Sequence, residues 1–326
     1  MCDGSLRSPS FPLVRVLSTG GTIASTHTSR GLVPTLSGEE LLAPLREEFA
    51  DRLRLDVRSV RHLDSSSMSA ADLDDLAAHV REALADPDIS GIVLTHGTDS
   101  MEETAMALHL LCPPRMPIIL TGAMLPADSP AADGPQNLRL ALRCASSPDY
   151  RGVRVAFAGH CLPAWGLLKT DTHAAESFAS PLPRTGRPPR SLAPDVAAPL
   201  PSLAGIEVPI ITAYPGAPRS LIESVLDAGA RGLVIEAMGA GNVGPELGEG
   251  IAAARERGVP VVLSSRVPFG EIATTYGGAG GGAELAELGV LGSGVLRAPQ
   301  ARILLIVALA LGREPAELLA LGEPGA

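Results

Sequence analysis

Short aliphatic runs that end in glycine-rich turns alternate along this chain with amphipathic stretches, and no other feature constrains the fold as strongly. Residues 13–21, 91–99 and 116–124 read LVRVLSTGG, GIVLTHGTD and MPIILTGAM. Between them, 69–86 and 100–111 place apolar residues at helical spacing. Strands that alternate with helices form a mostly parallel sheet covered on both faces. The sequence therefore predicts an α/β fold built on a doubly wound sheet.

A proline-rich stretch interrupts the alternation. Residues 180–204 read SPLPRTGRPPRSLAPDVAAPLPSLA, a composition typical of an extended linker without helix or strand. The alternation resumes with VPIITAYPG and continues to ARILLIVALALG. We therefore expect a larger N-terminal α/β catalytic domain over 12–190, a linker over 191–205 and a smaller C-terminal α/β domain over 206–326.

Charge and composition exclude several classes of protein. The chain has 26 Lys plus Arg and 36 Asp plus Glu, a net charge of −10, which argues against nucleic acid or an anionic membrane as the main partner. No apolar run approaches the ~18 residues of a membrane span, and the N-terminus has no secretory pattern. The four cysteines have no C-x-x-C spacing, so we expect free thiols and no metal site. A cytoplasmic protein is the expectation.

The strand end at STGGTIAS places Thr22 directly after two glycines. Glycines permit positive φ and close backbone approach, so a hydroxyl and several N–H groups can converge there. The phosphate-loop pattern G-x-x-x-x-G-K-[ST] and the dinucleotide pattern G-x-G-x-x-G are both absent. The stretch is either a catalytic site centred on Thr22 or a plain tight turn.

The stretch THGTDSMEETA combines a strand end with a helix start. Ser100 and Glu103 have capping-box spacing, which predicts a helix from about Met101. Thr98 and Asp99 then lie at the junction, where free backbone N–H groups can stabilise an oxyanion. Alternatively, Asp99 only supports the helix terminus.

A third candidate, LDSSSMSAADL, places Ser65 and Ser66 before another helix. Hydroxyls in this position either cap the helix or bind a carboxylate, and the pattern leaves both interpretations open.

Lys169 is the only lysine in the chain, so the other 26 − 1 = 25 basic residues are arginine. Arginine is effectively never deprotonated, whereas a desolvated lysine can lose its proton and relay it. The choice of lysine here indicates a titrating cation, a need for a compact ammonium, or chance. Side-chain amides are also scarce, with asparagine at Asn137 and Asn242 and glutamine at Gln136 and Gln300.

Together, TGGTIAS and HGTDSMEETA resemble the two signatures of the bacterial-type L-asparaginases and glutaminase-asparaginases. The segments TGAMLP, ADGPQNL, LLKTDTHAAESF and SSRVP fall in that family's order and spacing, and the resemblance covers roughly residues 12–321. It implies a larger N-terminal and a smaller C-terminal α/β domain, no cofactor, and no metal. It also implies a homodimer or homotetramer whose sites lie between the N-domain of one subunit and the C-domain of its dimer partner.

The resemblance implies hydrolysis of L-asparagine, in which Thr22 attacks the side-chain carboxamide and leaves a β-aspartyl ester. Thr98, Asp99 and Lys169 match the second catalytic group, where Lys169 biases the proton on Thr98. The resemblance also supplies substrate contacts. Ser65 binds the α-carboxylate, and Ser66 follows it among the substrate-binding residues. Asp99 binds the α-ammonium, the N–H groups of Thr98 and Ala123 face the oxyanion, and Asn242 reaches the neighbouring subunit's site. Asn137 falls in a motif that supports the site.

Three positions depart from the family pattern. Many members carry a tyrosine in the loop after TGGTIA, but here Arg30 or Gly31 stands nearest that position. We expect Tyr276, in the glycine-rich tract 275–289, to supply the phenol or to help close the site, and His27 is a weaker candidate. Ser66 stands where strong glutaminases often carry glutamine, and Ala279 stands among glycines where some members place a glutamate. These two departures predict modest substrate affinity and weak glutaminase activity.

Two other functions remain as alternatives. A catalytically weak or inactive asparagine-binding sensor of the same fold would explain the missing loop tyrosine. The related subunit of a tRNA-dependent amidotransferase shares the signatures, but it requires an added N-terminal domain and an RNA-binding face. This acidic chain has only about a dozen residues before its first strand, so we expect the hydrolase.

Overall fold

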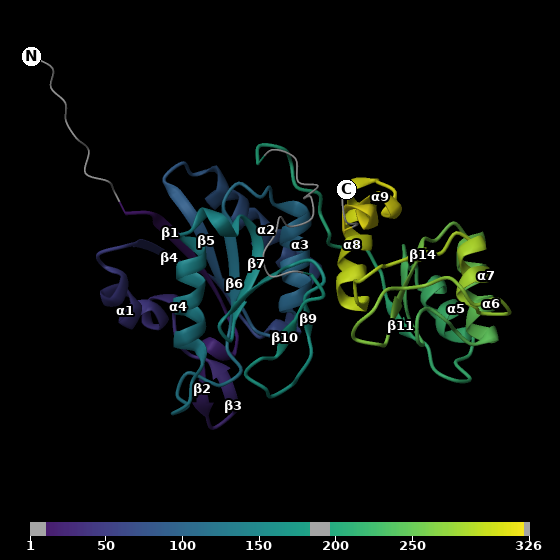
Figure 1. Ribbon diagram of the computed structural model, residues 1–326, viewed down its shortest axis with the longest axis horizontal. Helices are drawn as coiled ribbons and strands as arrows, with labels where there is room; N and C mark the ends of the chain where they lie inside the picture. Colours follow the sequence, from purple (N-terminus) through teal and green to yellow (C-terminus); the bar gives the residue numbers. More distant parts are fainter. Residues whose placement is uncertain (1–10, 183–195, 323–326) are drawn as a thin grey trace, which may run out of the picture. The chain divides into compact units, whose positions relative to one another are not determined.

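The computed structural model describes residues 11–182 and 196–322 (Figure 1). The chain divides into two compact units. The first comprises the chain up to Ser67, His79–Thr98 and Pro114–Cys161, and the second comprises Met68–Ala78, Asp99–Pro113 and the chain from Leu162 onward. Of the linker expected over 191–205, residues 191–195 lie outside the described residues, and 196–205 form turns and irregular backbone.

A six-stranded sheet organises the first unit, with the strand order β4-β1-β5-β6-β7-β8. Its strands are β1 (Leu13–Gly20), β4 (Arg54–Leu63), β5 (Ile89–Thr95), β6 (Pro117–Thr121), β7 (Gly152–Phe157) and β8 (His160–Pro163). The β4/β1, β1/β5, β5/β6 and β6/β7 pairs are all parallel. The expected α/β class with a mostly parallel sheet is confirmed.

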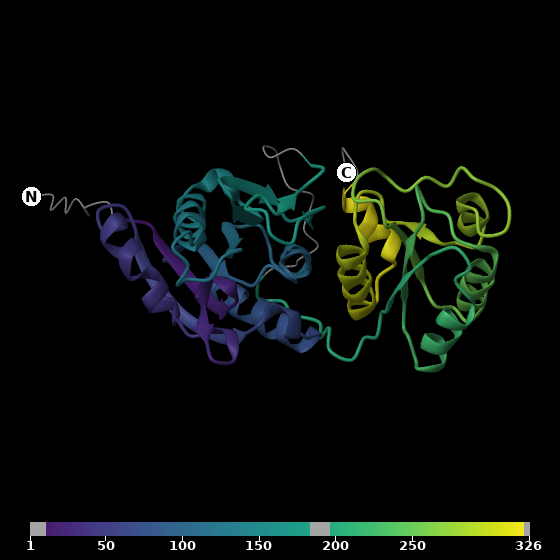
Figure 2. The same ribbon diagram turned by 90° about the horizontal axis from the view of Figure 1, so that it is seen from below.

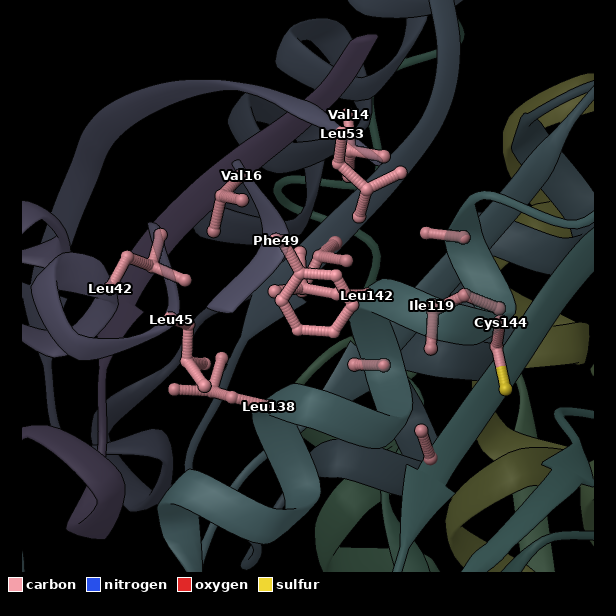
Figure 3. Packing of buried hydrophobic residues seen from close by; sticks show 14 of the residues in the cluster. Val14, Val16, Leu42, Leu45, Phe49, Leu53, Ile119, Leu138, Leu142 and Cys144 are labelled. Atoms are coloured by element: carbon pink, nitrogen blue, oxygen red, sulfur yellow. The ribbon is translucent and has the colours of Figure 1, made fainter. Parts of the chain in front are cut away.

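Helices α1 (Gly38–Phe49) and α4 (Gly134–Ala145) pack on one face of this sheet. Figure 3 shows their side chains meeting those of the strands, with Phe49 of α1 beside Leu142 of α4. Val14 and Val16 point into this cluster because alternate residues of a strand face the same side. Helix α1 begins with a capping box in which Ser37 accepts from the Glu40 N–H.

Strand β4 was not expected, because its sequence RLDVRSVRHL is rich in arginine. It lies at the sheet edge, where polar side chains reach water and guard against edge pairing. Its Asp56 accepts a 2.8 Å hydrogen bond from buried Arg15 of β1, which also lies 3.4 Å from Asp86. A cation inside the sheet is thus paired.

Several short elements connect the larger ones. After β1, the chain forms the 3₁₀ helix η1 (Thr22–Ala24) and a hairpin of β2 (Ser25–Thr28) and β3 (Gly31–Pro34). The others are η2 (Ser65–Ser67), α2 (Ala70–Ala85) and η3 (Pro148–Tyr150). The segment after Thr22 is therefore a folded hairpin.

The second unit contains a four-stranded parallel sheet in the order β11 (Ile210–Thr212), β12 (Leu233–Ala237), β13 (Val261–Ser265) and β14 (Leu291–Gly292). Helices α5 (Ser220–Asp227), α6 (Pro245–Glu256) and α7 (Gly282–Glu287) share one core cluster with these strands. Helix α8 (Ala298–Leu311) packs on the opposite face (Figure 2). The smaller C-terminal α/β fold expected from the sequence is thus present within this unit, around the four-stranded sheet.

Helix α3 (Met101–Leu111) packs against α8 within the second unit. Every residue of α3 except Glu103 is buried, as in a helix enclosed on all sides. The short strands β9 (Leu168–Lys169) and β10 (Phe178–Ala179) pair antiparallel, and the unit ends with α9 (Pro315–Leu319) and η4 (Ala320–Gly322). Among the described residues, no helix combines the length and apolar character needed to cross a membrane.

Candidate active site

Four neighbouring strands of the first unit end in loops that carry candidate residues. Ser65 follows β4, Thr22 follows β1, Thr98 follows β5 and Ala123 follows β6. Because these strands are parallel neighbours, their carboxyl ends lie along one edge of the sheet. Ligand sites of open α/β sheets form at this edge. The sheet therefore brings together the four candidate residues of the first unit.

Glycines allow the loops to touch. Gly20 and Gly21 have φ of 103° and 80°, a region open to glycine but strained for other residues. A Cβ atom on Gly21 would lie 2.5 Å from the nitrogen of Gly97, and one on Gly97 would overlap the Ser65 hydroxyl. The loops of Thr22, Thr98 and Ser65 are thus in direct contact, and they leave no room for additional side-chain atoms.

The hydroxyls differ in their exposure. Thr22 opens η1 and is half-buried, while Ser65 and Thr98 are buried. The turn itself is fixed by two hydrogen bonds, from the Thr19 hydroxyl to the Thr95 carbonyl at 2.7 Å and from the Ser25 hydroxyl to the Gly21 carbonyl at 2.9 Å. Thr22 therefore combines a held main chain with a side chain that is not fully enclosed.

His96, which precedes Gly97, is a supporting residue that the sequence patterns did not indicate. Its ring is fully buried, and Nδ1 lies 2.7 Å from the Gly97 carbonyl oxygen. Burial lowers the pKa of His96, so the ring is neutral at pH 7. This contact fixes the peptide that leads into Thr98.

Asp133 and Asn137 hold the loop that contains Ala123. The Asp133 carboxylate accepts from the N–H groups of Met124 and Leu125, and Asn137 Nδ2 donates to the Gly122 carbonyl at 3.0 Å. Asn137 Oδ1 also accepts the Ala158 N–H at 2.9 Å. The supporting role expected for Asn137 therefore has a geometric basis.

The second unit contains the other two candidates for the catalytic group. Lys169 Nζ donates to Asp99 Oδ1 at 2.7 Å, with the lysine side chain 20% exposed and the aspartate side chain 59% exposed. Lys169 lies on β9, opposite Phe178 of β10. Asp99 directly follows Thr98 along the chain. The only lysine is thus paired with the aspartate of the HGTD motif.

Helix α3 begins at Met101 as predicted, but the predicted capping box is wrong. The Ser100 side chain makes no capping hydrogen bond. Glu103 instead faces a cavity of about 110 Å³, which Thr104 and Arg302 also line. Burial raises the pKa of Glu103, and the neighbouring Arg302 lowers it. The carboxylate that matched the capping pattern is therefore turned toward α8.

Glu102 is a buried carboxylate that the sequence patterns did not single out. It is 7% exposed, and its Oε2 accepts the main-chain N–H of Lys169 at 2.7 Å. Burial, helped by the negative charge of Glu103, raises the pKa of Glu102 to about 7 against the opposing effects of the Lys169 N–H and ammonium. A carboxyl that changes charge near neutral pH thus contacts Lys169.

Gln300 connects three segments around Glu102. Its Nε2 donates to the carbonyls of Glu102 and Ala164, at 3.1 and 2.7 Å, and its Oε1 accepts the Gly166 N–H at 2.8 Å. The scarcity of glutamine in the chain was the one signal that could have pointed to it.

Asn242 and Tyr276 lie elsewhere in the second unit. Asn242 Oδ1 accepts the Gly282 N–H at 3.3 Å, and its main chain pairs with Met238. Tyr276 is 63% exposed and precedes the tight glycine turn before α7. Tyr276 and Ala279 lie within the glycine-rich tract 275–289, and Asn242 contacts that tract through Gly282.

The remaining candidates lie on exposed parts of the first unit. Ser66 is exposed, and its N–H donates to Asp64 Oδ1 at 3.2 Å. The His27 ring lies 3.0 Å from Asp128, which also accepts the His27 N–H. Arg30 and Gly31 form the tip of the β2–β3 hairpin. His27 is therefore tied to Asp128 and is not simply solvated.

Over residues 11–182 and 196–322, no group of three or more His, Cys, Asp or Glu side chains is placed to hold a metal ion. The residues described above offer hydroxyls, an ammonium and carboxylates. Such groups suit nucleophilic attack with proton transfer.

Comparisons with known proteins agree with this geometry. The asparaginase N-terminal family model matches residues 13–187, and the glutaminase/asparaginase C-terminal domain model matches 207–321. The chain is 37% identical over 317 residues to the probable L-asparaginase of Deinococcus radiodurans, covering 93% of this chain and 94% of that protein. It is 31% identical over 296 residues to a glutamyl-tRNA(Gln) amidotransferase subunit of Methanopyrus kandleri, covering 81% of this chain and 63% of that protein.

A solved structure shares the fold. The crystal structure of the probable cytoplasmic L-asparaginase from Campylobacter jejuni superposes with a TM-score of 0.81 at 27% identity, and the match covers 95% of this chain and 98% of that one. The family models span most of the chain, a relative exceeds 30% identity, and this solved structure shares the fold. These findings lead to one conclusion. The chain belongs to the bacterial-type L-asparaginase family.

Proposed function

We propose that the protein hydrolyses L-asparagine to L-aspartate and ammonia. The observation that carries this proposal is the contact between three strand-end loops, each of which contributes one residue with a hydroxyl group. These residues are Thr22, Ser65 and Thr98. The pairing of the only lysine with Asp99 supports it. The relative in Deinococcus radiodurans, named a probable L-asparaginase, supports the choice of substrate.

In the proposed mechanism, Thr22 Oγ attacks the side-chain carboxamide carbon of asparagine, and the Thr22 hydroxyl proton passes to the proton route of Thr98 and Lys169. The C–N bond then breaks, and the leaving nitrogen takes a proton from the same route and departs as ammonia. Water attacks the resulting β-aspartyl ester, which releases aspartate and restores the Thr22 hydroxyl. The N–H groups of Thr98 and Ala123 stabilise the oxyanion in both steps.

Thr98 and Lys169 provide the proton route, and Asp99 orients Lys169 through their 2.7 Å ion pair. Lysine suits this task because its ammonium can lose a proton when desolvated. Ser65 binds the α-carboxylate, Ser66 lies beside it as a substrate-binding residue, and Asp99 binds the α-ammonium. Asn242 and Tyr276 act in the site of a partner subunit, so the active form is a homodimer or homotetramer.

The substrate preference follows from two small residues. Ser66 and Ala279 replace longer polar side chains that other members place near the α-groups of the substrate. We therefore propose modest affinity for asparagine and weak activity toward glutamine, in a protein that acts in the cytoplasm. A kcat/KM for glutamine within tenfold of that for asparagine would contradict this selectivity.

The first experiment is to incubate the purified protein with L-asparagine and to measure ammonia and aspartate, with Thr22→Ala as the inactive control. Hydroxylamine should divert the ester to β-aspartylhydroxamate in the wild type only. Ammonia release that is equal in both proteins would remove Thr22 from the mechanism.

The hairpin after Thr22 contains no tyrosine, which is the one feature in keeping with an asparagine-binding sensor without turnover, but the relatives named L-asparaginase do not favour that alternative. Calorimetric binding of asparagine without any ammonia release would identify that function. Ammonia release by the wild type at a rate far above that of Thr22→Ala would exclude it.

A further inference from the structure

Lys169 is held at both of its ends by one short segment of the chain. Its ammonium donates to Asp99, and its main-chain N–H donates to Glu102, each at 2.7 Å. Asp99 and Glu102 are three residues apart, the first lying two residues before α3 and the second within its first turn. The start of α3 thus holds both the main-chain N–H and the ammonium of Lys169.

The carboxylate of Glu102 is itself fixed. It is 7% exposed on a helix that is buried on nearly all sides, and α8 packs against that helix. Gln300 of α8 donates to the Glu102 carbonyl at 3.1 Å and to the Ala164 carbonyl at 2.7 Å. Because Ala164 belongs to the polypeptide that leads into β9, the same glutamine holds the helix and the approach to Lys169.

We propose that Glu102 is a positioning residue for Lys169. The buried carboxylate of Glu102 holds the main chain of Lys169 so that the lysine ammonium reaches Asp99. The hydrogen bond is a property of the fold alone. Its effect on turnover rests on the proposed function, in which Lys169 transfers a proton.

The charges that face Glu102 determine when this contact is strongest. Its own helix presents Glu103, β9 presents the Lys169 ammonium, and α8 presents the neutral Gln300, while Arg302 of α8 acts on Glu103. Burial raises the pKa of Glu102 to about 7. Above that pH the carboxylate is an anion and accepts a charge-assisted bond, whereas below it the neutral acid is a weaker acceptor. Lys169 is therefore held more firmly as the pH rises through 7.

The single lysine makes this contact directly observable. A protein labelled with ¹⁵N-lysine in a deuterated background has one labelled main-chain amide, that of Lys169. We expect its proton and nitrogen shifts to move with pH and to show a midpoint near 7 as Glu102 ionises. A Lys169 amide whose shifts neither move between pH 5.5 and 8.5 nor differ between the wild type and Glu102→Gln overturns the proposal.

Two neighbouring carboxylates give a matched pair of variants. Glu102→Gln keeps an acceptor but cannot ionise, so the transition near pH 7 should disappear. Glu103→Gln removes the negative charge that helps to raise the pKa of Glu102, so the transition should remain but move to lower pH. The same transition in Glu102→Gln as in the wild type would assign it to another group and overturn the proposal.

Turnover gives the second readout. We expect Glu102→Gln to lower kcat by roughly tenfold, with a smaller change in KM, because a displaced proton-transfer group affects the chemical step. Its kcat should also lack the rise through pH 7 that we expect of the wild type. No ammonia from the wild type would reject the proposed function, while the amide titration would still decide the role of Glu102. Normal turnover with an unchanged pH profile in Glu102→Gln would reject the positioning role alone.

Discussion

The ammonium of Lys169 lies 2.7 Å from the Oδ1 atom of Asp99, which joins the only lysine of the chain to the residue directly after Thr98. An arginine could pair with the same carboxylate, and all of the other Lys or Arg positions in the chain are arginine. The pairing alone therefore does not explain the lysine. The two residue types differ in that lysine has a compact ammonium and an amine able to release a proton, whereas a guanidinium does not release one.

Lys169→Arg should retain the pairing with Asp99 and lose turnover. We expect kcat to fall by roughly 10²–10⁴, the usual contribution of a positioned acid or base, because a guanidinium does not release its proton. Ammonia release and asparagine binding should be measured together, since binding should change much less. Equal turnover in both proteins would make the single lysine an accident of composition.

Gly21→Ala should disrupt the contact between the loops of Thr22 and Thr98. Its Cβ would lie 2.5 Å from the Gly97 nitrogen, and its φ of 80° is strained for alanine. We expect a loss of about 3 kcal/mol or more in the free energy of unfolding, since both overlap and strain act. Gly31→Ala is the control, because its φ is 97° but no atom lies within 4 Å. The control should lose only about 1–2 kcal/mol. Equal thermal midpoints for the two variants would contradict the close packing.

The placement of the candidate residues of the first unit at strand ends could be predicted from the sequence because it depends on local patterns. Thr22, Thr98 and Ala123 each follow an apolar run that ends in glycine, and such runs become neighbouring parallel strands. Strand β4 was missed, although Ser65 depends on it. An edge strand needs apolar residues at fewer positions than a central strand. The arginines of β4 therefore did not match the apolar pattern by which the other strands were predicted.

The environment of Lys169 could not be predicted in the same way. Glu102 lies in a polar-looking helix start, yet it is buried on a helix against which α8 packs, and Gln300 of α8, almost two hundred residues later, donates to its carbonyl. Glu103 matched a capping box but turns toward Arg302. In both cases a tertiary contact with α8 overrides the local pattern, and periodicity within α3 contains no information about that contact.

Asn137→Ala should weaken both the fold and the site. Removal of the amide leaves the Gly122 carbonyl and the Ala158 N–H without the hydrogen bonds that Asn137 provides. We expect a loss of about 2–3 kcal/mol in the free energy of unfolding, because buried polar groups lose their partners. The Ala123 loop should also shift, so kcat should fall more than KM changes. Urea unfolding and steady-state kinetics would test this, and unchanged kinetics in a destabilised protein would limit Asn137 to a structural role.

Tyr276→Phe tests whether the exposed phenol of the second unit replaces the missing loop tyrosine. If Tyr276 serves a partner's site, kcat/KM for asparagine should fall by roughly tenfold or more, since a hydrogen-bonding hydroxyl is lost. Tyr214→Phe is the matched control, because Tyr214 is also an exposed tyrosine of the second unit and lies outside the glycine-rich tract. Identical kcat/KM values for the wild type and both variants would exclude Tyr276 from the reaction.

His109→Leu should change how stability depends on pH. His109 is buried on α3 with its ring edge-on to Trp165, the centroids 5.8 Å apart, and burial lowers its pKa to about 4. The unfolded chain, with a histidine pKa of about 6.5, binds the proton first as the pH falls, so the wild type loses up to about 3 kcal/mol between pH 6.5 and 4. Glu102 acts in the opposite direction, because its raised pKa makes the folded state bind a proton first between pH 7 and 4.5. The variant loses the His109 contribution but keeps those of Glu102, Glu103 and His96, so its thermal midpoint relative to the wild type should rise on going from pH 7 to pH 5. A constant difference between the two midpoints at both pH values would show that His109 does not titrate with unfolding.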